Sequence, residues 1–347
     1  MAKPKQKAAT TTGRRARGGV RDIRITDVAA LAQVSPITVS RALNNPEVVA
    51  PETLLRVQQI VQQLGYVPNR LAGSLSSSKS RLIAAIVPTV SHSLFSASIQ
   101  VFSDAMSRAG YQVLLGLAGY NEADELRVLD AALSRRPEGV LLVGVARTAP
   151  LRARLLSLRL PTVETWDDTD LPVDMLVGFS HYDVGVAVAQ HFIERGRTRP
   201  AVVSANDARA RARHDGFVQA MARHGITDVA DVSVAPPSSV ALGREKLAEI
   251  LDARRDVDCV FCGSDLLALG VLGEARDRGI AVPDALSICG FGDLEFAAEM
   301  RPALTSVRVD GKRIGMAAAD CLIARLAGVS AQGNVDVGFT IVSRDTA

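Results

Sequence analysis

The side chains best placed to do chemistry lie in residues 35–44, SPITVSRALN. Ser35 followed by Pro36 is typical of a helix start, because a serine hydroxyl caps the first turn and proline fits the first helical position. Apolar residues share one face of this helix. The opposite face is small and polar and carries one long cation, Arg41. Such a face fits the major groove of DNA. A helical hairpin that only forms part of a core is the alternative.

Neighbouring segments would hold this helix in place. Residues 26–33 repeat apolar side chains at helical spacing (Val28, Ala29, Leu31 and Ala32), and a further amphipathic helix begins at Pro51 and ends at Gly65. The pattern predicts three small helices packed together. Their second helix would be presented outward, as in a helix-turn-helix.

Charge is unevenly distributed along the 347 residues. Residues 1–80 hold 12 Lys and Arg against 4 Asp and Glu, a net charge of +8, whereas the rest holds 28 against 33, a net charge of −5. A basic head on an acidic body is typical of a nucleic-acid-binding module joined to a regulatory domain. Residues 1–23 are poor in apolar side chains, and we expect them to form a disordered basic tail.

From Arg81 onward, short apolar strands alternate with amphipathic helices, first over about 81–180 and again from about 181. This alternation predicts an α/β protein with two tandem doubly wound parallel-sheet units. A Walker motif, G-x-G-x-x-G, H-E-x-x-H and G-x-S-x-G are all absent from the sequence, which argues against several enzyme classes.

The four cysteines lie at 259, 262, 289 and 321. Cys259 and Cys262 have the spacing of a metal or redox pair, but they belong to the apolar strand CVFC, where side chains three apart point to opposite faces. We therefore expect buried structural thiols. The sequence shows no secretion signal and no apolar run long enough to cross a bilayer, so a cytoplasmic location is expected.

Motifs spread over residues 24–345 resemble the lactose-repressor (LacI) family of bacterial transcription regulators. They are ITDVAALAQVSPITVSRALN, YVPNRLAGSL, FCGSDLLALGVL, RGIAVPDALSICGF and RPALTSVRVD. VETWDD, DMLVGF, VFCGSD and VDVGFT further resemble the gluconate-utilisation repressors. The resemblance implies an all-α helix-turn-helix head, a hinge helix and two subdomains like those of periplasmic binding proteins.

On this resemblance the domain boundaries are expected at 24–66 for the head, 67–80 for the hinge linker and 81–347 for the ligand-binding and dimerisation core. The N-subdomain would take about 81–180 and 309–329. The C-subdomain would take about 181–308 and 330–347.

The resemblance also implies which head residues touch DNA. Pro36, Ile37 and Arg41 would face bases, and Leu75 of the hinge would wedge into the minor groove. Ser35, Thr38, Ser40 and Asn44 are candidates for phosphate contacts, with helix caps and solvent-facing polar residues as the alternative. The predicted DNA-contacting set is completed by Thr26, Asn69 and Arg70.

A small-molecule effector is expected where the carboxyl ends of the strands of both subdomains meet. The family resemblance places Arg213 against the ligand, which suits the carboxylate of a sugar acid. Trp166 is a candidate for stacking on the sugar, with a core aromatic as the alternative. The other predicted effector-binding residues follow strand ends: Ser91, His92, Ser93, Phe95, Asp167, Ser264, Asp265, Gly292 and Asp293.

Together these observations predict a regulator, not an enzyme, that needs no cofactor or metal. We expect a homodimer, a repressor that gluconate or a ketogluconate releases from a palindromic operator on double-stranded DNA. A sugar-binding transport protein of the same two-lobed fold and a sugar-metabolising enzyme are the alternatives.

Overall fold

The computed structural model describes residues 23–66, 80–90, 93–330 and 333–347. The chain divides into two compact units, residues 1–78 and residues 79–347, and each is described by itself. Apart from their last residues, 23 and 80, the predicted tail (1–23) and the predicted hinge linker (67–80) lie outside the described residues. Within the described residues, no helix is long and apolar enough to cross a membrane.

The described part of the first unit, residues 23–66, is a bundle of three short α-helices. They are α1 (Ile25–Ala32), α2 (Pro36–Asn44) and α3 (Pro51–Leu64), with a single 3₁₀ turn, η1 (Pro46–Val48), between the last two. Ser35 caps α2 by accepting the Thr38 N–H at 3.1 Å. Gly65 ends α3 with a left-handed φ of +63°, which glycine adopts at little cost. The helix starts and stops predicted at Ser35–Pro36, Pro51 and Gly65 are confirmed.

A small aliphatic core holds these helices together. Its buried members are Val28, Ala29, Ala32, Val39, Ala42 and Val57. They come from all three helices, so the outward face of α2 is fixed by the packing behind it.

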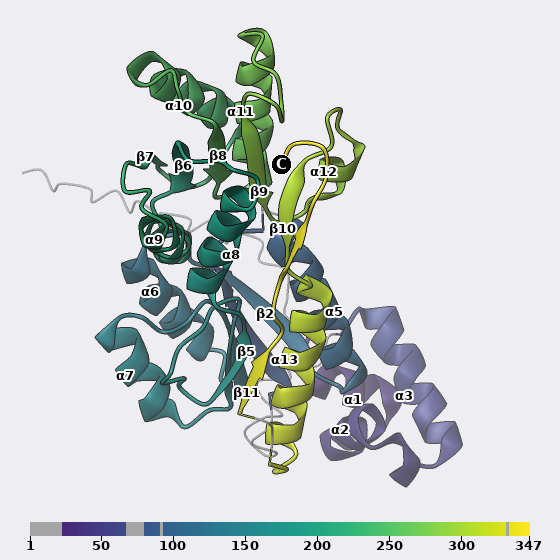
Figure 1. Cartoon of the computed structure of the whole chain (residues 1–347). Coiled ribbons are helices and arrows are strands. Elements are labelled where there is room, and N and C mark those ends of the chain that lie inside the picture. The colour runs from purple at the N-terminus through teal and green to yellow at the C-terminus, as the bar shows by residue number, and fades with distance from the viewer. Residues whose placement is uncertain (1–22, 67–79, 91–92, 331–332) are drawn as a thin grey trace, which may run out of the picture. The chain divides into compact units, whose positions relative to one another are not determined.

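The second unit contains two six-stranded sheets, which confirms the predicted α/β class (Figure 1). The strand order of the first sheet is β11-β5-β4-β3-β1-β2, and all of its neighbouring strands are parallel. Its elements are β1 (Leu82–Val87), α5 (Ser93–Arg108), β2 (Gln112–Leu117), α6 (Glu122–Leu133), β3 (Gly139–Val143), α7 (Ala149–Leu158), β4 (Thr162–Thr165), β5 (Met175–Gly178), α13 (Gly311–Leu326) and β11 (Asn334–Asp336). We call this half the first lobe.

The second lobe repeats the architecture. Its strand order is β12-β10-β9-β8-β6-β7, parallel except for β12, which runs antiparallel to β10. Its elements are α8 (His181–Ile193), β6 (Pro200–Ala205), α9 (Ala208–Arg223), β7 (Ala230–Val234), α10 (Val240–Ala253), β8 (Cys259–Cys262), α11 (Asp265–Asp277), β9 (Ser287–Phe291), α12 (Glu295–Glu299), β10 (Thr305–Arg308) and β12 (Thr340–Val342).

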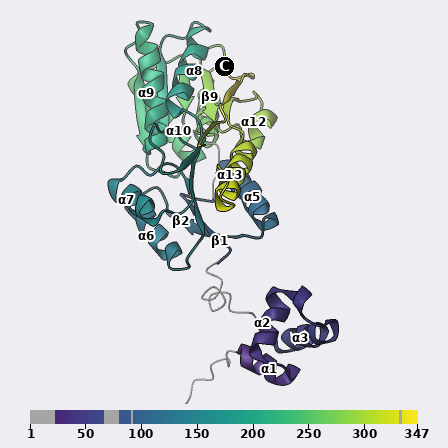
Figure 2. The ribbon, with the colours of Figure 1, turned by 90° about the horizontal axis from the view of Figure 1, so that it is seen from below.

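The chain crosses between the lobes three times. It passes from β5 to α8, returns from β10 to α13, and passes from β11 to β12. In both views α13 lies beside α5, as one of the helices that cover the first sheet (Figures 1 and 2). The crossings bring the carboxyl ends of strands from both sheets to one place.

One expected boundary is wrong. Residues 330–347 were assigned entirely to the C-subdomain, but β11 pairs in parallel with β5 in the first sheet, with Val335 opposite Val177. The reason is connectivity: α13 packs on the first lobe, so the chain that leaves it meets the free edge of β5 before it reaches the second sheet.

The cysteine pair behaves as structural thiols. Cys259 and Cys262 are both fully buried on β8, and they pack into two different apolar cores, one on each face of the sheet. Burial raises the pKa of both thiols. A buried, neutral thiol is a poor nucleophile and a poor metal ligand.

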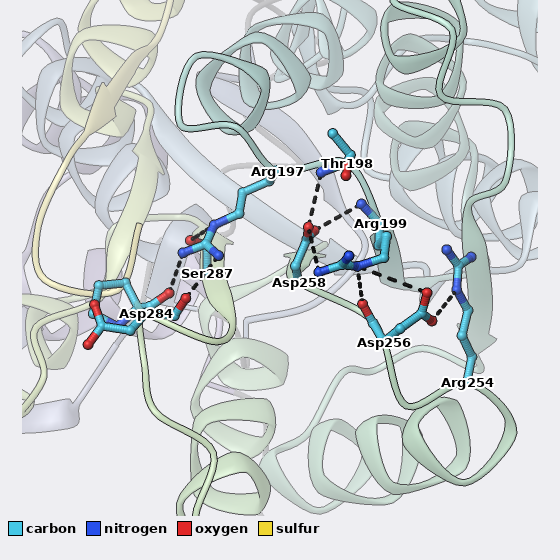
Figure 3. A network of polar contacts seen from close by, with 9 residues as sticks. Arg197, Thr198, Arg199, Arg254, Asp256, Asp258, Asp284 and Ser287 are labelled. Atoms are coloured by element: carbon cyan, nitrogen blue, oxygen red, sulfur yellow. Dashed lines mark hydrogen bonds and ion pairs between the residues drawn. The ribbon is translucent and has the colours of Figure 1, made fainter.

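The amino ends of the second sheet are tied together by a network of arginines and carboxylates (Figure 3). Asp258, just before β8, accepts the N–H groups of Thr198 and Arg199 at 3.1 and 3.0 Å. Arg197 reaches across to Ser287 at the start of β9 and to the carbonyl of Asp284, both at 3.0 Å. This network fixes the strands at the end opposite their carboxyl ends.

Candidate functional site

The outward face of α2 carries the side chains expected to reach DNA bases. Pro36 and Arg41 are exposed, and Ile37 is 65% exposed although it is apolar. An exposed isoleucine beside a proline and one arginine offers apolar contact and one cationic fork to a groove.

The hydroxyl and amide groups on the same helix also bond within it. The Ser35 and Thr38 hydroxyl oxygens lie 2.9 Å apart, and Asn44 Nδ2 donates to the Ser40 carbonyl at 3.0 Å. Helix capping is therefore one role of Ser35, as the alternative interpretation held. Thr26, in the first turn of α1, is exposed.

Several predicted residues cannot be placed. Asn69, Arg70 and Leu75 of the hinge, and Ser91 and His92 after β1, lie outside the described residues. Ser93 is the first residue of α5, and the position of its side chain is not described.

A cavity of 1370 Å³ opens between the two lobes, at the carboxyl ends of strands from both sheets. This is the edge at which open α/β sheets bind ligands. The predicted effector residues that line the cavity are Phe95, Trp166, Arg213, Ser264, Asp265, Gly292 and Asp293.

Arg213 is a buried cation at this cavity. It projects from α9 and is 6% exposed, and its guanidinium lies 4.2 Å from the centre of the Phe291 ring. Nη2 donates to the Gly263 carbonyl at 3.3 Å, whereas Nε is buried without a hydrogen-bond partner. Among the described residues, no carboxylate pairs with it. Burial lowers the pKa of Arg213 to about 10, so it stays charged at neutral pH.

His181 is the third partner of Arg213. Arg213 Nη1 lies 2.9 Å from His181 Nδ1, and His181 Nε2 lies 3.0 Å from the Trp166 carbonyl. Burial, reinforced by the nearby Arg213, holds the pKa of His181 well below its usual value. The imidazole is therefore neutral: Nδ1 accepts from the guanidinium and Nε2–H donates to the carbonyl. This contact joins the second lobe to the end of β4 in the first.

Four aromatic rings pack next to these polar groups, and three of them line the cavity: Phe95, Trp166 and Phe291. Phe95, Trp166, Phe179 and Phe291 follow one another with centroid separations of 5.2, 6.3 and 6.4 Å. Trp166 is 1% exposed, and its indole N–H donates to Ser98 Oγ at 3.0 Å. A ring buried to this extent acts mainly as packing, which favours the core interpretation over stacking on a ligand.

Ser264 and Asp265 start α11 and are used within the protein. The Ser264 hydroxyl caps the helix by accepting the Leu267 N–H at 3.3 Å. Asp265 is fully buried and accepts from Ser306 Oγ at 2.6 Å and from the Leu294 N–H at 2.7 Å. Both carboxylate oxygens are engaged, so Asp265 fixes the loop that follows β9.

That loop carries Gly292 and Asp293. Gly292 has a φ of +128°, a conformation that favours glycine. Asp293 forms ion pairs with Arg308 at 2.5 Å and with Arg344 at 2.7 Å. These two arginines already have an anionic partner, in contrast to Arg213.

Asp167 lines a second, smaller hollow of 390 Å³ that adjoins the first and shares Tyr120, Asp207 and Arg209 with it. Its carboxylate pairs with Arg147 at 2.6 Å and is 2% exposed. Asp167 therefore belongs to the first lobe's side of the cleft.

Three residues of the cavity were not predicted from the sequence: His181, Phe291 and Arg209. Arg209 could have been found, because the run RARAR places Arg209 and Arg213 four residues apart and hence on one helix face, with Arg211 turned away. His181 follows β5, and Phe291 is the last residue of β9. Both lie at the edge of the sheets where ligand contacts were expected.

Comparison with known proteins decides the family. Bacterial regulatory proteins of the lacI family match at residues 24–69, and the periplasmic binding protein-like domain matches at residues 189–347. The HTH-type transcriptional regulator GntR of Pseudomonas aeruginosa is 35% identical over 325 residues, which cover 93% of this chain and 95% of that protein. The chain belongs to the LacI family.

Other relatives agree with this assignment. The HTH-type transcriptional regulator IdnR of Escherichia coli K12 is 31% identical and covers 93% of this LacI-family chain and 98% of its own. A LacI-family regulator from Silicibacter pomeroyi matches in structure with a TM-score of 0.88 at 30% identity, over 93% of this chain and 99% of that one. The lac repressor dimer bound to operator and the anti-inducer ONPF shares the fold, with a TM-score of 0.81 at 22% identity over 94% and 99% of the chains.

The broad function follows from these matches. This LacI-family protein is a ligand-responsive, DNA-binding transcriptional regulator. The relatives are regulators and not enzymes, which confirms the expectation drawn from the absence of enzyme motifs. A DNA-binding head on the two-lobed core also distinguishes the chain from a transport protein.

Proposed function

We propose that this regulator is a repressor of sugar-acid utilisation genes and that a sugar acid, gluconate or a ketogluconate, is its inducer. The observation that carries the proposal is Arg213: a buried, charged guanidinium at the cavity whose Nε has no hydrogen-bond partner. A buried cation without an anion is costly, and a ligand carboxylate would supply the missing charge through a planar pair of hydrogen bonds.

The surrounding residues suit a polyhydroxy acid. Arg213 lies over Phe291, and neutral His181 holds the guanidinium in a fixed orientation. The motifs that resemble gluconate-utilisation repressors, and the relatives named GntR, support the same class of ligand.

The DNA side of the proposal uses two heads. A homodimer would place two copies of α2 on the half-sites of a palindromic operator, since protein symmetry is matched by operator symmetry. Pro36, Ile37 and Arg41 would face bases, and Leu75 of the hinge would enter the minor groove. With a single long polar reader on α2, part of the operator choice would come from DNA deformability.

Ligand binding in the cavity would change the DNA affinity of the head. A ligand that touches both lobes favours one arrangement of the lobes over another, and it releases DNA only if it binds the arrangement that disfavours DNA. His181 bridges the lobes next to Arg213, so a carboxylate bound there would act at the contact between them.

The test is a gel shift with the full-length protein and DNA that it selects from a randomised pool. Addition of millimolar gluconate or 2-ketogluconate should release the DNA, whereas glucose should not, because glucose lacks the carboxylate. Arg41→Ala serves as the variant that loses sequence-selective binding without a change in the cavity. Tighter DNA binding with the acid would reverse the proposed inducer role. Binding unaffected by either acid would refute the proposed ligand class.

A further inference from the structure

Another of the cations that line the same cavity, Arg209, has no role in the proposal above. Arg209 is one helical turn before Arg213 on α9, and it lines both the main cavity and the adjoining hollow. Its Nη1 is buried and has no hydrogen-bond partner among residues 80–90, 93–330 and 333–347, and its guanidinium lies 5.1 Å from the centre of the Phe95 ring. Within the part of the chain that the structure describes, Arg209 and Arg213 thus share one feature at this cavity: each has a buried N–H group with no acceptor.

The two guanidiniums lie against different aromatic rings of the cavity. Arg213 lies over Phe291 of the second lobe, whereas Arg209 lies over Phe95 of α5 in the first. Residues four apart on a helix have Cβ atoms about 5–6 Å apart, and these side chains diverge from there. A single carboxylate that binds in the plane of the Arg213 guanidinium leaves Arg209 without an anionic partner.

Other cations of the adjoining hollow already have partners. Arg147 pairs with Asp167 at 2.6 Å, and Arg211 donates to Asn206 Oδ1 at 2.8 Å. The acid nearest to Arg209 in sequence, Asp207, accepts the backbone N–H groups of Arg209 and Ala210 as the cap of α9. Arg209 is therefore the cation at the junction of the two hollows that retains an unused donor.

We propose that the cleft selects a ligand with two acidic ends, a sugar acid whose carboxylate binds Arg213 and whose second anionic group binds Arg209. This inference rests on the proposed function, since it assigns the first acidic group to Arg213. A phosphate at the far end of an aldonic acid and the second carboxylate of an aldaric acid share the required chemistry, because both accept from a guanidinium fork.

Binding measurements on the full-length protein test the proposal. Isothermal titration would compare gluconate (one carboxylate), 6-phosphogluconate (carboxylate and phosphate) and galactarate (two carboxylates). We expect at least one doubly acidic ligand to bind about tenfold or more tightly than gluconate, as one additional charge-assisted contact implies. Whichever of the two gains affinity identifies the second group as phosphate or carboxylate.

Arg209→Gln should abolish this preference and leave the gluconate affinity within about threefold of the wild-type value. Arg223→Gln is the matched control: it removes one charge from the same helix at an exposed position outside both hollows, and it should preserve the preference. Arg213→Gln should weaken all three ligands.

Three results would overturn the inference. If gluconate binds wild type as tightly as both doubly acidic ligands, no second subsite exists. If Arg209→Gln weakens gluconate as much as the others, both arginines hold one carboxylate. In these two cases the proposed sugar-acid function stands. If none of the three acids binds, the proposed function fails together with the inference.

Discussion

The two ends of the second lobe's sheet use arginines in opposite ways. At the amino ends, Arg197 and Arg199 are matched to carboxylates, carbonyls and a hydroxyl from neighbouring strands (Figure 3). At the carboxyl ends, Arg209 and Arg213 each keep a buried N–H group that has no partner among the residues that the structure describes. Natural proteins rarely leave buried polar groups unsatisfied, so the end with spare donors is the end arranged for a ligand. The matched arginines at the amino ends hold the strands in place.

Asp258 provides the strongest test of the difference between the two ends of the sheet. This carboxylate is 5% exposed and accepts two backbone N–H groups besides pairing with Arg199 at 3.5 Å. Asp258→Ala should lower the free energy of unfolding by about 2 kcal/mol, because two part-buried backbone N–H groups lose their acceptor and Arg199 loses one of its two carboxylates. Urea unfolding would measure the loss, and titration with gluconate below the unfolding transition should show an unchanged affinity.

Asp256→Ala is the control for Asp258. Asp256 belongs to the same network but its side chain is 60% exposed, so its ion pairs contribute less than about 1 kcal/mol. Equal losses for the two variants would show that burial does not decide the role of this network. A large change in gluconate affinity would show that the two ends are not separable.

Arg213→Gln should show the reverse behaviour. We expect gluconate affinity to fall about 100-fold, corresponding to about 2.7 kcal/mol, since a charge-assisted pair with the carboxylate is lost. The free energy of unfolding should change by less than about 1 kcal/mol, because removal of a costly buried charge offsets the lost hydrogen bonds to Gly263 and His181. Titration and urea unfolding of the same preparation measure both quantities.

Arg213→Lys sharpens this result. Lysine keeps the charge but lacks the planar fork, so an affinity intermediate between wild type and Arg213→Gln is expected. If Arg213→Gln instead destabilised the protein strongly with little effect on affinity, Arg213 would belong with the matched arginines of the amino ends.

The sequence allowed the strands and helices to be predicted well because their signals are local. The Ser35–Pro36 helix start and the apolar strand runs depend on neighbours along the chain. The sheet that β11 joins could not be predicted from the sequence. Whether Asn334–Asp336 pairs with the first or the second sheet depends on where α13 ends in space.

The candidate site was harder to predict for the same reason. Arg213 was found from the resemblance and lies at the cavity. That it lacks an anionic partner, while Arg308 and Arg344 share Asp293, depends on residues brought together only by folding. Trp166 likewise could not be recognised as packing until Ser98 and Phe95 were placed around it.

Asp265 provides the most demanding test of the difference between the two ends. It lies at the carboxyl ends, yet both of its carboxylate oxygens accept hydrogen bonds, as the carboxylates at the amino ends do. Burial raises the pKa of its carboxyl to about 6, although the bonds from Ser306 and Leu294 oppose the shift. An unfolded aspartate has a pKa near 3.9, so between about pH 4 and pH 6 the folded chain holds a proton that the unfolded chain has released. Asp265 therefore makes the free energy of unfolding fall by about 3 kcal/mol as pH rises through this window.

Asp265→Asn should remove that contribution. The amide oxygen can accept from the Leu294 N–H and the NH₂ group can donate to Ser306, so both contacts have a replacement. Urea unfolding at several pH values should show the variant gaining stability relative to wild type from pH 4 to pH 7. Gluconate affinity should stay within about threefold of wild type, because neither carboxylate oxygen is free for a ligand. If wild type and Asp265→Asn showed parallel curves of unfolding free energy against pH, and the variant lost much of its gluconate affinity, Asp265 would be a ligand contact like Arg213. The position of a residue at the carboxyl ends would then decide whether it binds ligand, even when its hydrogen bonds are satisfied.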